Sequence, residues 1–220
     1  MRSSILQLFT QQVVTIGKIT PQHIEMLGSG FFITKNKIAT TRHVVGSGGD
    51  GLVILLPHIN DINAYQDTSD KSCNTINAKI IEIDPIKDLA LLEIDGSLNG
   101  NLPEIGGFDE VNVSDVIGIF GFPHSVEGRR VLTFQKAEVG AKVLLEANGV
   151  KSKHAVINIQ ARPGQSGSLV FSSSLNKIVG ILMGAYAPIF GGDISLGGIN
   201  PRELHQTTHC ISAEYLKEML

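Results

Sequence analysis

A serine stands between glycines in the segment ARPGQSGSLVF, residues 161–171. A serine that attacks a carbonyl carbon needs backbone N–H groups close to the carbonyl oxygen, and glycines leave room for that approach. The pattern is weak by itself, because most Gly-Ser clusters are turns and this chain has 24 glycines. Ser166 becomes a candidate nucleophile only if the chain also supplies a base and a group that orients the base.

Two other segments supply candidates for those groups. His43 lies in ATTRHVVG, residues 39–46, at the end of an apolar-polar run, and histidine is the usual general base near neutral pH. Asp88 lies in IEIDPIKDLALLEI, residues 81–94, directly before an apolar strand. Burying an unpaired carboxylate there would cost several kcal/mol, so we expect Asp88 to be solvated or hydrogen-bonded at the strand mouth.

The order His43, Asp88, Ser166 is the chain order of chymotrypsin-type proteases and differs from that of subtilisins and α/β-hydrolases. The surrounding residues resemble the same family. The segments that carry the resemblance are GSGFFITKNKIATTRHVV, DPIKDLALLEI, VIGIFGFP, PGQSGSLVF and KIVGIL. They are most similar to HtrA-type and other bacterial trypsin-like domains without an appended PDZ domain, and the resemblance runs from about Gln12 to Leu220.

The resemblance implies a serine endopeptidase that forms an acyl-enzyme and needs neither metal nor other cofactor. His43 would take the Ser166 proton, Asp88 would hold the imidazole, and the loop of Gly164, Gln165 and Ser166 would form the oxyanion hole. The expected partners are a protein or peptide substrate and a regulatory partner protein. Many secreted relatives carry an aspartate at the position of Gln165, which pairs with a new N-terminal amine, and glutamine cannot form that ion pair.

The resemblance also places the substrate pocket. Its walls would be the residues Gln160, Leu182, Met183, Gly184 and Ala185. Gln160 stands where trypsin-like enzymes have an acidic floor, so we expect a small or medium apolar side chain rather than lysine or arginine at the cleavage site. Met183 stands where many relatives have a serine that touches the aspartate, which leaves the hydrogen bonding of Asp88 open.

Short β-favouring runs separated by Gly, Asn, Asp and Pro recur every eight to twelve residues, which is typical of an all-β sandwich or barrel. With the family resemblance this predicts two six-stranded antiparallel Greek-key β-barrels, the chymotrypsin-like double barrel. We expect the first barrel, with His43 and Asp88, in residues 1–102, a linker in 103–112, and the second barrel, with Ser166, in 113–220. Ser212 can cap a short C-terminal helix, AEYLKEML.

The composition is that of a globular chain, with 42% hydrophobic and 18% charged residues. A net charge of −3 gives no basic surface for nucleic acid, and no apolar run approaches the roughly 20 residues that span a bilayer. The N-terminal segment does not read as a signal peptide, and Cys73 and Cys210 give no disulfide framework. These features predict a cytoplasmic protease under regulation.

Three rival interpretations stay open at this point. His205, His209 and Cys210 could be read as a zinc site, although two histidines with one thiol on the opposite strand face make a poor ligand set. The chain could be a protease-fold binding or scaffold module without catalysis, against which the complete set of His43, Asp88 and Ser166 argues. The same site could also serve an esterase or acyl transferase.

Overall fold

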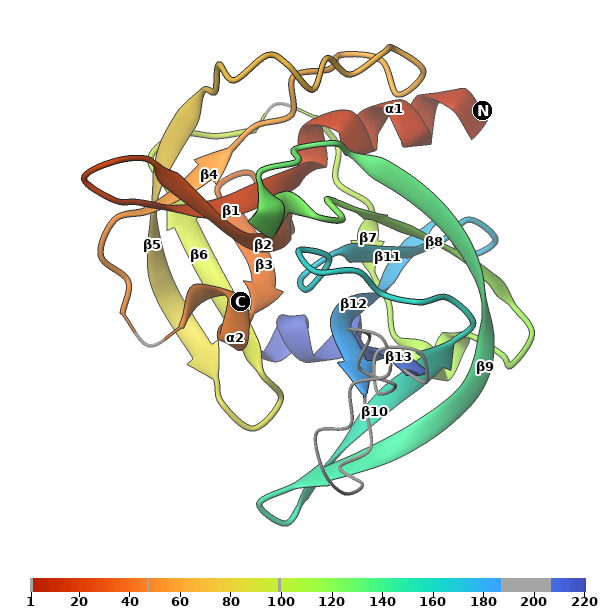
Figure 1. Cartoon of the computed structure of the whole chain (residues 1–220). Helices are drawn as coiled ribbons and strands as arrows, with labels where there is room; N and C mark the ends of the chain where they lie inside the picture. Colours follow the sequence, from red (N-terminus) through yellow and green to blue (C-terminus); the bar gives the residue numbers. More distant parts are fainter. Residues whose placement is uncertain (1, 47, 99, 187–206) are drawn as a thin grey trace, which may run out of the picture.

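The apolar runs of the first half close into a barrel. The computed structural model describes residues 2–46, 48–98, 100–186 and 207–220, and Figure 1 shows the chain. The first barrel consists of β1 (Val13–Ile19), β2 (Ile24–Phe32), β3 (Lys37–Thr41), β4 (Leu52–Leu55), β5 (Thr75–Asp84) and β6 (Leu89–Ile94). All neighbours pair antiparallel in the closed order β1-β2-β3-β6-β5-β4.

The second half repeats this topology. Its strands are β8 (Val116–Gly121), β9 (Thr133–Ala147), β10 (Val150–Ile157), β11 (Leu169–Ser172), β12 (Lys177–Tyr186) and β13 (Thr207–Ser212). Their order is β8-β9-β10-β13-β12-β11, closed by the β11–β8 pairing, which is the first barrel's order shifted along the chain. The predicted double barrel of antiparallel Greek keys is therefore confirmed.

The segment between the barrels has structure of its own. The two-residue strand β7 (Glu104–Ile105) pairs parallel with β12, and the 3₁₀ turn η1 (Phe108–Glu110) follows it. Both lie within residues 103–112, which the sequence suggested as a linker. The proposed division at these boundaries stays a prediction.

Helices are few and short. Besides η1, those in the described part of the chain are α1 (Arg2–Gln12), α2 (Arg42–Val45), the 3₁₀ turn η2 (Ser125–Glu127) and the C-terminal 3₁₀ helix η3 (Ala213–Glu218). The last confirms the expected C-terminal helix, with Ser212 at its N-cap position but without a side-chain cap. Within the ranges given above, no helix has the length and apolar character needed to cross a membrane.

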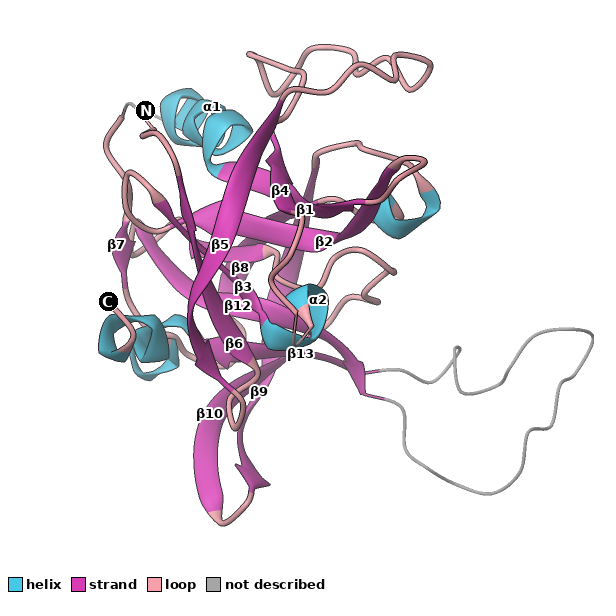
Figure 2. Cartoon of the chain, turned by 90° about the vertical axis from the view of Figure 1, so that its left-hand side faces the viewer, coloured by secondary structure: helices cyan, strands magenta, loops and turns pink. Residues whose placement is uncertain are grey.

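One hairpin is longer than the sequence indicated. We expected strands near 130–140 and 154–160, whereas β9 and β10 continue to a turn at Asn148 and Gly149 and project from the second barrel (Figure 2). Residues 144–147 and 150–151 at its outer end are all exposed, so this part lacks the alternation of buried and exposed positions that marks a barrel strand. A further strand expected near 193–199 lies outside the described residues.

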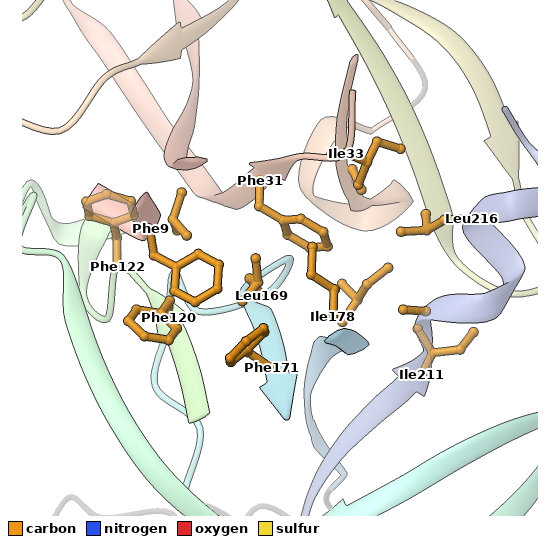
Figure 3. Packing of buried hydrophobic residues seen from close by; sticks show 14 of the residues in the cluster. Phe9, Phe31, Ile33, Phe120, Phe122, Leu169, Phe171, Ile178, Ile211 and Leu216 are labelled. Atoms are coloured by element: carbon orange, nitrogen blue, oxygen red, sulfur yellow. The ribbon is translucent and has the colours of Figure 1, made fainter. Parts of the chain in front are cut away.

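The two barrels share a buried apolar core, drawn in Figure 3. Phe9 of α1 packs on two rings of the second barrel, with centroid distances of 4.5 Å to Phe120 and 5.0 Å to Phe171. All three rings are at most 1% exposed, and burying each contributes about 1.5–3 kcal/mol. At the other end of the chain, the buried Leu216 of η3 joins the same core. The N-terminal helix α1 and the C-terminal helix η3 therefore both pack into the core between the two barrels.

Candidate active site

His43 lies on α2, a single helical turn between the barrels. The turn is anchored by Val44 and Val45, which are buried, while the His43 side chain on the other side is 46% exposed. The N–H of Arg42 donates to the backbone carbonyl of Asp88 at 2.9 Å. This bond fixes the start of α2 against the start of β6, so that two residues 45 positions apart meet.

Asp88 ends the tight turn that joins β5 to β6. The Asp84 carboxylate accepts the N–H groups of Ile86 and Lys87, each at 2.9 Å, and the Lys87 ammonium at 2.7 Å. Asp88 itself has a left-handed φ of 56°. Aspartate tolerates this conformation better than most residues. The turn thus aims the Asp88 side chain at α2.

The Asp88 carboxylate binds His43 through both oxygens. Oδ1 accepts the backbone N–H of His43 at 2.9 Å, and Oδ2 lies 2.5 Å from Nδ1 of the imidazole ring. A carboxylate is an acceptor, so the proton of the neutral imidazole belongs on Nδ1. Nε2 then carries a lone pair and can accept a proton as a general base. Thr41 Oγ1 lies 3.5 Å from Nε2.

Ser166 comes from the second barrel and meets α2 across Gly28. A Cβ on Gly28 would lie 2.7 Å from the Val44 side chain and 3.1 Å from the Ser166 carbonyl oxygen. The Ser166 hydroxyl donates to the carbonyl of Met183 at 3.1 Å. In the described part of the chain, no hydrogen bond joins it to His43. The Ser166 hydroxyl would have to leave the Met183 carbonyl before Nε2 could take its proton, and such contacts often tighten only when substrate binds.

The loop before Ser166 leaves two N–H groups unused. The N–H groups of Gly164 and Ser166 donate no hydrogen bond among the described residues, while the Gln165 N–H donates to the Arg162 carbonyl at 3.1 Å. Gln165 therefore differs from its two neighbours, because its amide is already occupied by a turn. Two free donors on one loop, with Gly164 at a left-handed φ of 87°, are what binding of an oxyanion requires.

The Gln165 side chain braces this loop. Its Oε1 accepts the Arg162 N–H at 2.7 Å, and its Nε2 donates to Gln135 Oε1 on β9 at 2.6 Å. The side chain is 1% exposed, so both amide atoms act in a buried place. At the position where many secreted relatives have an aspartate paired with an N-terminal amine, this chain thus has an uncharged glutamine that hydrogen-bonds to β9.

The residues expected to line a substrate pocket differ in burial, from fully buried to exposed. The Leu182 side chain is fully buried in the second barrel's own core, so it contributes backbone and not pocket surface. Met183 is half-buried against the inter-barrel core and offers its carbonyl to Ser166. Gly184 has a φ of +132°, and a Cβ on it would lie 3.6 Å from Ser166 Oγ, so its backbone lies close to the serine. Gln160 is exposed. Ala185 continues β12.

Sequence reasoning missed the small polar residues that hold the site. Buried Thr208 accepts the Ala161 N–H at 2.9 Å and donates to the Ile159 carbonyl at 2.6 Å, which ties the segment before the nucleophile loop to β13. Buried Ser29 on β2 bonds directly to the nucleophile loop. For Ser29, the only signal in the sequence was its place between two glycines in GSGFF.

The histidines considered for zinc are not brought together with enough ligands. His209 lies on β13 beside Cys210, which is fully buried, and His205 lies outside the described residues. Over the parts of the chain with described positions, no group of three or more His, Cys, Asp or Glu could hold a metal ion. Burial lowers the pKa of His209 and raises that of the Cys210 thiol.

Comparison with protein families gives one match, to a model described as a trypsin-like peptidase domain, over residues 28–181. A protein of Pseudomonas putida (strain W619), named "Probable periplasmic serine endoprotease DegP-like", is 30% identical over 163 residues. These are 71% of this chain and 29% of the relative. A protein of the same name from Bartonella henselae is 27% identical over 170 residues, or 77% and 30% of the two chains. The chain thus spans under a third of these relatives.

Solved structures show the same fold at low identity. The Rv3671c protease of M. tuberculosis in its active form has a TM-score of 0.68 at 17% identity, covering 99% of this chain and 82% of that one. The HtrA-type protease AlgW with a decapeptide has a TM-score of 0.64 at 18% identity, covering 96% and 63%. The MamO protease domain from Magnetospirillum magneticum has a TM-score of 0.68 at 15% identity, covering 96% of each chain.

The expected cytoplasmic location is wrong, because the curated relatives are named as periplasmic endoproteases. That expectation rested partly on the cysteine count. Cys73 lies in the loop between β4 and β5 of the first barrel, and Cys210 is buried in β13 of the second. Both are free thiols, and a count of two says little about the compartment when the two residues lie in different barrels.

Proposed function

The chain belongs to the trypsin-like peptidase family, and from this membership we propose that it is a serine endopeptidase that works through His43, Asp88 and Ser166. The observation that carries the proposal is the pair of unused N–H groups on Gly164 and Ser166, beside a serine hydroxyl and an imidazole already oriented by a carboxylate. A turn with no role in binding would not need to leave two donors unpaired.

The reaction begins when the Ser166 hydroxyl leaves the Met183 carbonyl and turns to His43. Nε2 takes the hydroxyl proton while Oγ bonds to the carbonyl carbon of the substrate, whose oxygen gains the negative charge. The N–H groups of Gly164 and Ser166 then bind that oxyanion. Asp88 accepts the hydrogen bond from Nδ1 throughout and stabilises the imidazolium without taking its proton.

The second half of the cycle returns the protons. The imidazolium gives the Nε2 proton to the leaving amine as the carbon–nitrogen bond breaks, which leaves an ester on Ser166. Water then attacks this ester as His43 takes one proton from it, and His43 gives that proton back to Oγ as the acid product departs. No group beyond the chain, the peptide and water is needed for this balance.

The substrate class is protein or peptide, since the family acts on peptide bonds. Following the names of the curated relatives, we place the protein in the periplasm. The hydrogen bond from Ser166 to Met183 supports regulation, because a bound peptide or a partner protein that breaks it would release the nucleophile. The exposed Gln160 carries no charge, so we retain the proposed preference for a small or medium apolar side chain before the cleaved bond.

Labelling with a fluorophosphonate probe tests the nucleophile, because the probe reacts with activated serines. We expect the wild type and the exposed-serine control Ser173→Ala to label, and Ser166→Ala to remain unlabelled. Cleavage of an unfolded protein, with mass spectrometry of the products, then tests the reaction class. A folded wild type that takes no label would favour a silent binding module, and one that hydrolyses esters but no peptides would favour an esterase.

A further inference from the structure

Each carbonyl of the nucleophile loop has one fixed hydrogen-bond partner. The Pro163 oxygen accepts from the His124 N–H at 2.6 Å, and the Gln165 oxygen accepts from the Ser168 N–H at 2.9 Å. With these carbonyls turned away, the N–H groups of the same peptides, which belong to Gly164 and Ser166, point to the other side. The orientation of the two free donors is therefore set directly by the contacts of the Pro163 and Gln165 carbonyls, and indirectly by the contacts that hold the peptide between them.

Two other carbonyls of the nucleophile loop, those of Gly164 and Ser166, are held by a single residue of the first barrel. The Ser29 hydroxyl donates to the Gly164 oxygen at 2.8 Å, and the Ser29 N–H donates to the Ser166 oxygen at 2.9 Å. Ser29 lies on β2 and is 0% exposed. One small residue of the first barrel thus holds the loop of the second barrel on both sides of Gln165.

The direction of the Ser29 hydroxyl is itself fixed. Its oxygen accepts the main-chain N–H of Phe122 at 3.0 Å, so its single proton is left for the Gly164 carbonyl. The Ser29 carbonyl is fixed as well, since it accepts from Thr40 Oγ1 at 2.7 Å. Every polar atom of Ser29 therefore has a partner, and three of the four contacts lead to the second barrel.

We infer that Ser29 is a positioning residue for the oxyanion site, a role that rests on the proposed endopeptidase function. Gly164 has a left-handed φ and no side chain to restrict it, so the peptides on either side of it can rotate unless they are held. Ser29 holds the peptide that follows Gly164, and His124 holds the one that precedes it. Without the Ser29 hydroxyl, the buried Gly164 carbonyl loses its partner, and only the bond from the Gln165 N–H to the Arg162 carbonyl still holds that peptide. The peptide can then rotate, and the N–H groups of Gly164 and Ser166 on the two adjoining peptides shift from the oxyanion.

The test compares two buried serines that differ in this hydrogen bond. Ser152 on β10 is also buried, and its hydroxyl donates to the Leu145 carbonyl at 3.4 Å within the β9–β10 hairpin. Ser29→Ala should lower kcat for a peptide substrate about 10- to 100-fold with KM within about threefold, because the oxyanion exists only after attack. Ser152→Ala, the same chemical change, should leave kcat within about twofold of wild type.

A peptide boronate provides a second measurement, because its tetrahedral adduct with Ser166 uses the oxyanion donors. Ser29→Ala should bind it about 10- to 100-fold more weakly than Ser152→Ala does, while both bind the product peptide equally. If Ser29→Ala does not fold, Ser29→Cys keeps a weak donor in the same place, and its kcat should be at least fivefold below wild type with KM unchanged.

Two results separate the failures. An active wild type in which Ser29→Ala equals Ser152→Ala in kcat and boronate affinity, or in which Ser29→Cys equals wild type, overturns the role of Ser29 alone. A folded wild type that cleaves no peptide and takes no fluorophosphonate overturns the endopeptidase proposal, and the role of Ser29 with it.

Discussion

Substituting Gly164 by alanine tests whether the conformation of the nucleophile loop, and not only its composition, makes the site. Gly164 has a φ of 87°, and a Cβ built on it would meet three atoms of the neighbouring loop. One is the Ser125 hydroxyl, which has no hydrogen-bond partner and can rotate aside. The other two are main-chain atoms, the Phe122 oxygen and the Ser125 nitrogen, each 2.8 Å away, so the backbone itself must move.

The magnitude has two parts. A left-handed conformation costs an alanine about 1–2 kcal/mol, which lowers stability wherever it occurs. The clash adds a displacement of the Gly164 N–H, and losing one oxyanion donor typically costs about 10²–10³ in rate, or roughly 2.7–4 kcal/mol. We therefore expect Gly164→Ala to lose about 10²–10³ in kcat, with a smaller change in KM.

Gly149→Ala is the matched control. Gly149 has a φ of 79° at the tip of the β9–β10 hairpin, and a Cβ there would meet nothing within 4 Å. It carries the same backbone strain as Gly164→Ala without the clash, so urea unfolding should show a loss of about 1–2 kcal/mol while kcat stays unchanged. The reasoning is refuted if folded Gly164→Ala hydrolyses peptides within about threefold of the rate of Gly149→Ala.

The remaining predictions concern the carboxylates and the thiols. Asp88→Asn keeps a residue that tolerates the φ of 56° but offers Nδ1 the wrong partner, so kcat should fall by about 10⁴ at an unchanged melting temperature; a loss below tenfold would contradict the role of Asp88. Although burial raises it, hydrogen bonds from Lys87 and Ile86 hold the pKa of Asp84 below its usual range. The stability that this lowered pKa gives is present above the pKa of the unfolded state and is lost as pH falls through the pKa of the folded state. Asp84→Asn should therefore lower the free energy of unfolding in urea at pH 7 and differ less from wild type near pH 3. An equal difference at both pH values would exclude this contribution of Asp84. Because burial raises the pKa of the Cys210 thiol, iodoacetamide at pH 8 should alkylate Cys73 in the native protein and Cys210 only after unfolding, as mass spectrometry of the peptides would report.

The candidate residues His43, Asp88 and Ser166 could be singled out from the sequence because each lies in a local pattern. The apolar run after Asp88 and the glycines around Ser166 are features of neighbouring residues, and their order along the chain gave the family. The meeting of His43 and Asp88 in the structure follows from the β3–β6 pairing, in which Thr41 lies opposite Leu89. The Ser166 hydroxyl, in contrast, donates a hydrogen bond to the Met183 carbonyl, and this arrangement depends on a side-chain rotamer that has no signal in the sequence.

The supporting contacts could not be predicted, because they join positions far apart through small polar residues. Ser29 and Gly164 are 135 positions apart, and a buried serine has no hydropathy pattern that distinguishes it from an exposed one. The outer β9–β10 hairpin was missed for a related reason, since its exposed Leu144 and Val150 cover no core. Binary patterning reports which face is buried, and it carries no information where neither face is.

These long-range contacts mean that neither barrel holds a complete site. Hydrogen bonds from Ser29 cross from the first barrel to both sides of Gln165, and a Cβ on Gly167 would collide with the Ser29 carbonyl, so the two backbones are in close contact there. A packed interface of this kind admits small shifts only at the cost of its hydrogen bonds. A relative shift of the barrels would separate His43 from Ser166 and, through Ser29, would also release the Gly164–Gln165 peptide, which lies between the two peptides that carry the free N–H groups. The proposed base, nucleophile and oxyanion donors are therefore coupled to one interface, and any effector that weakens this interface acts on all three together.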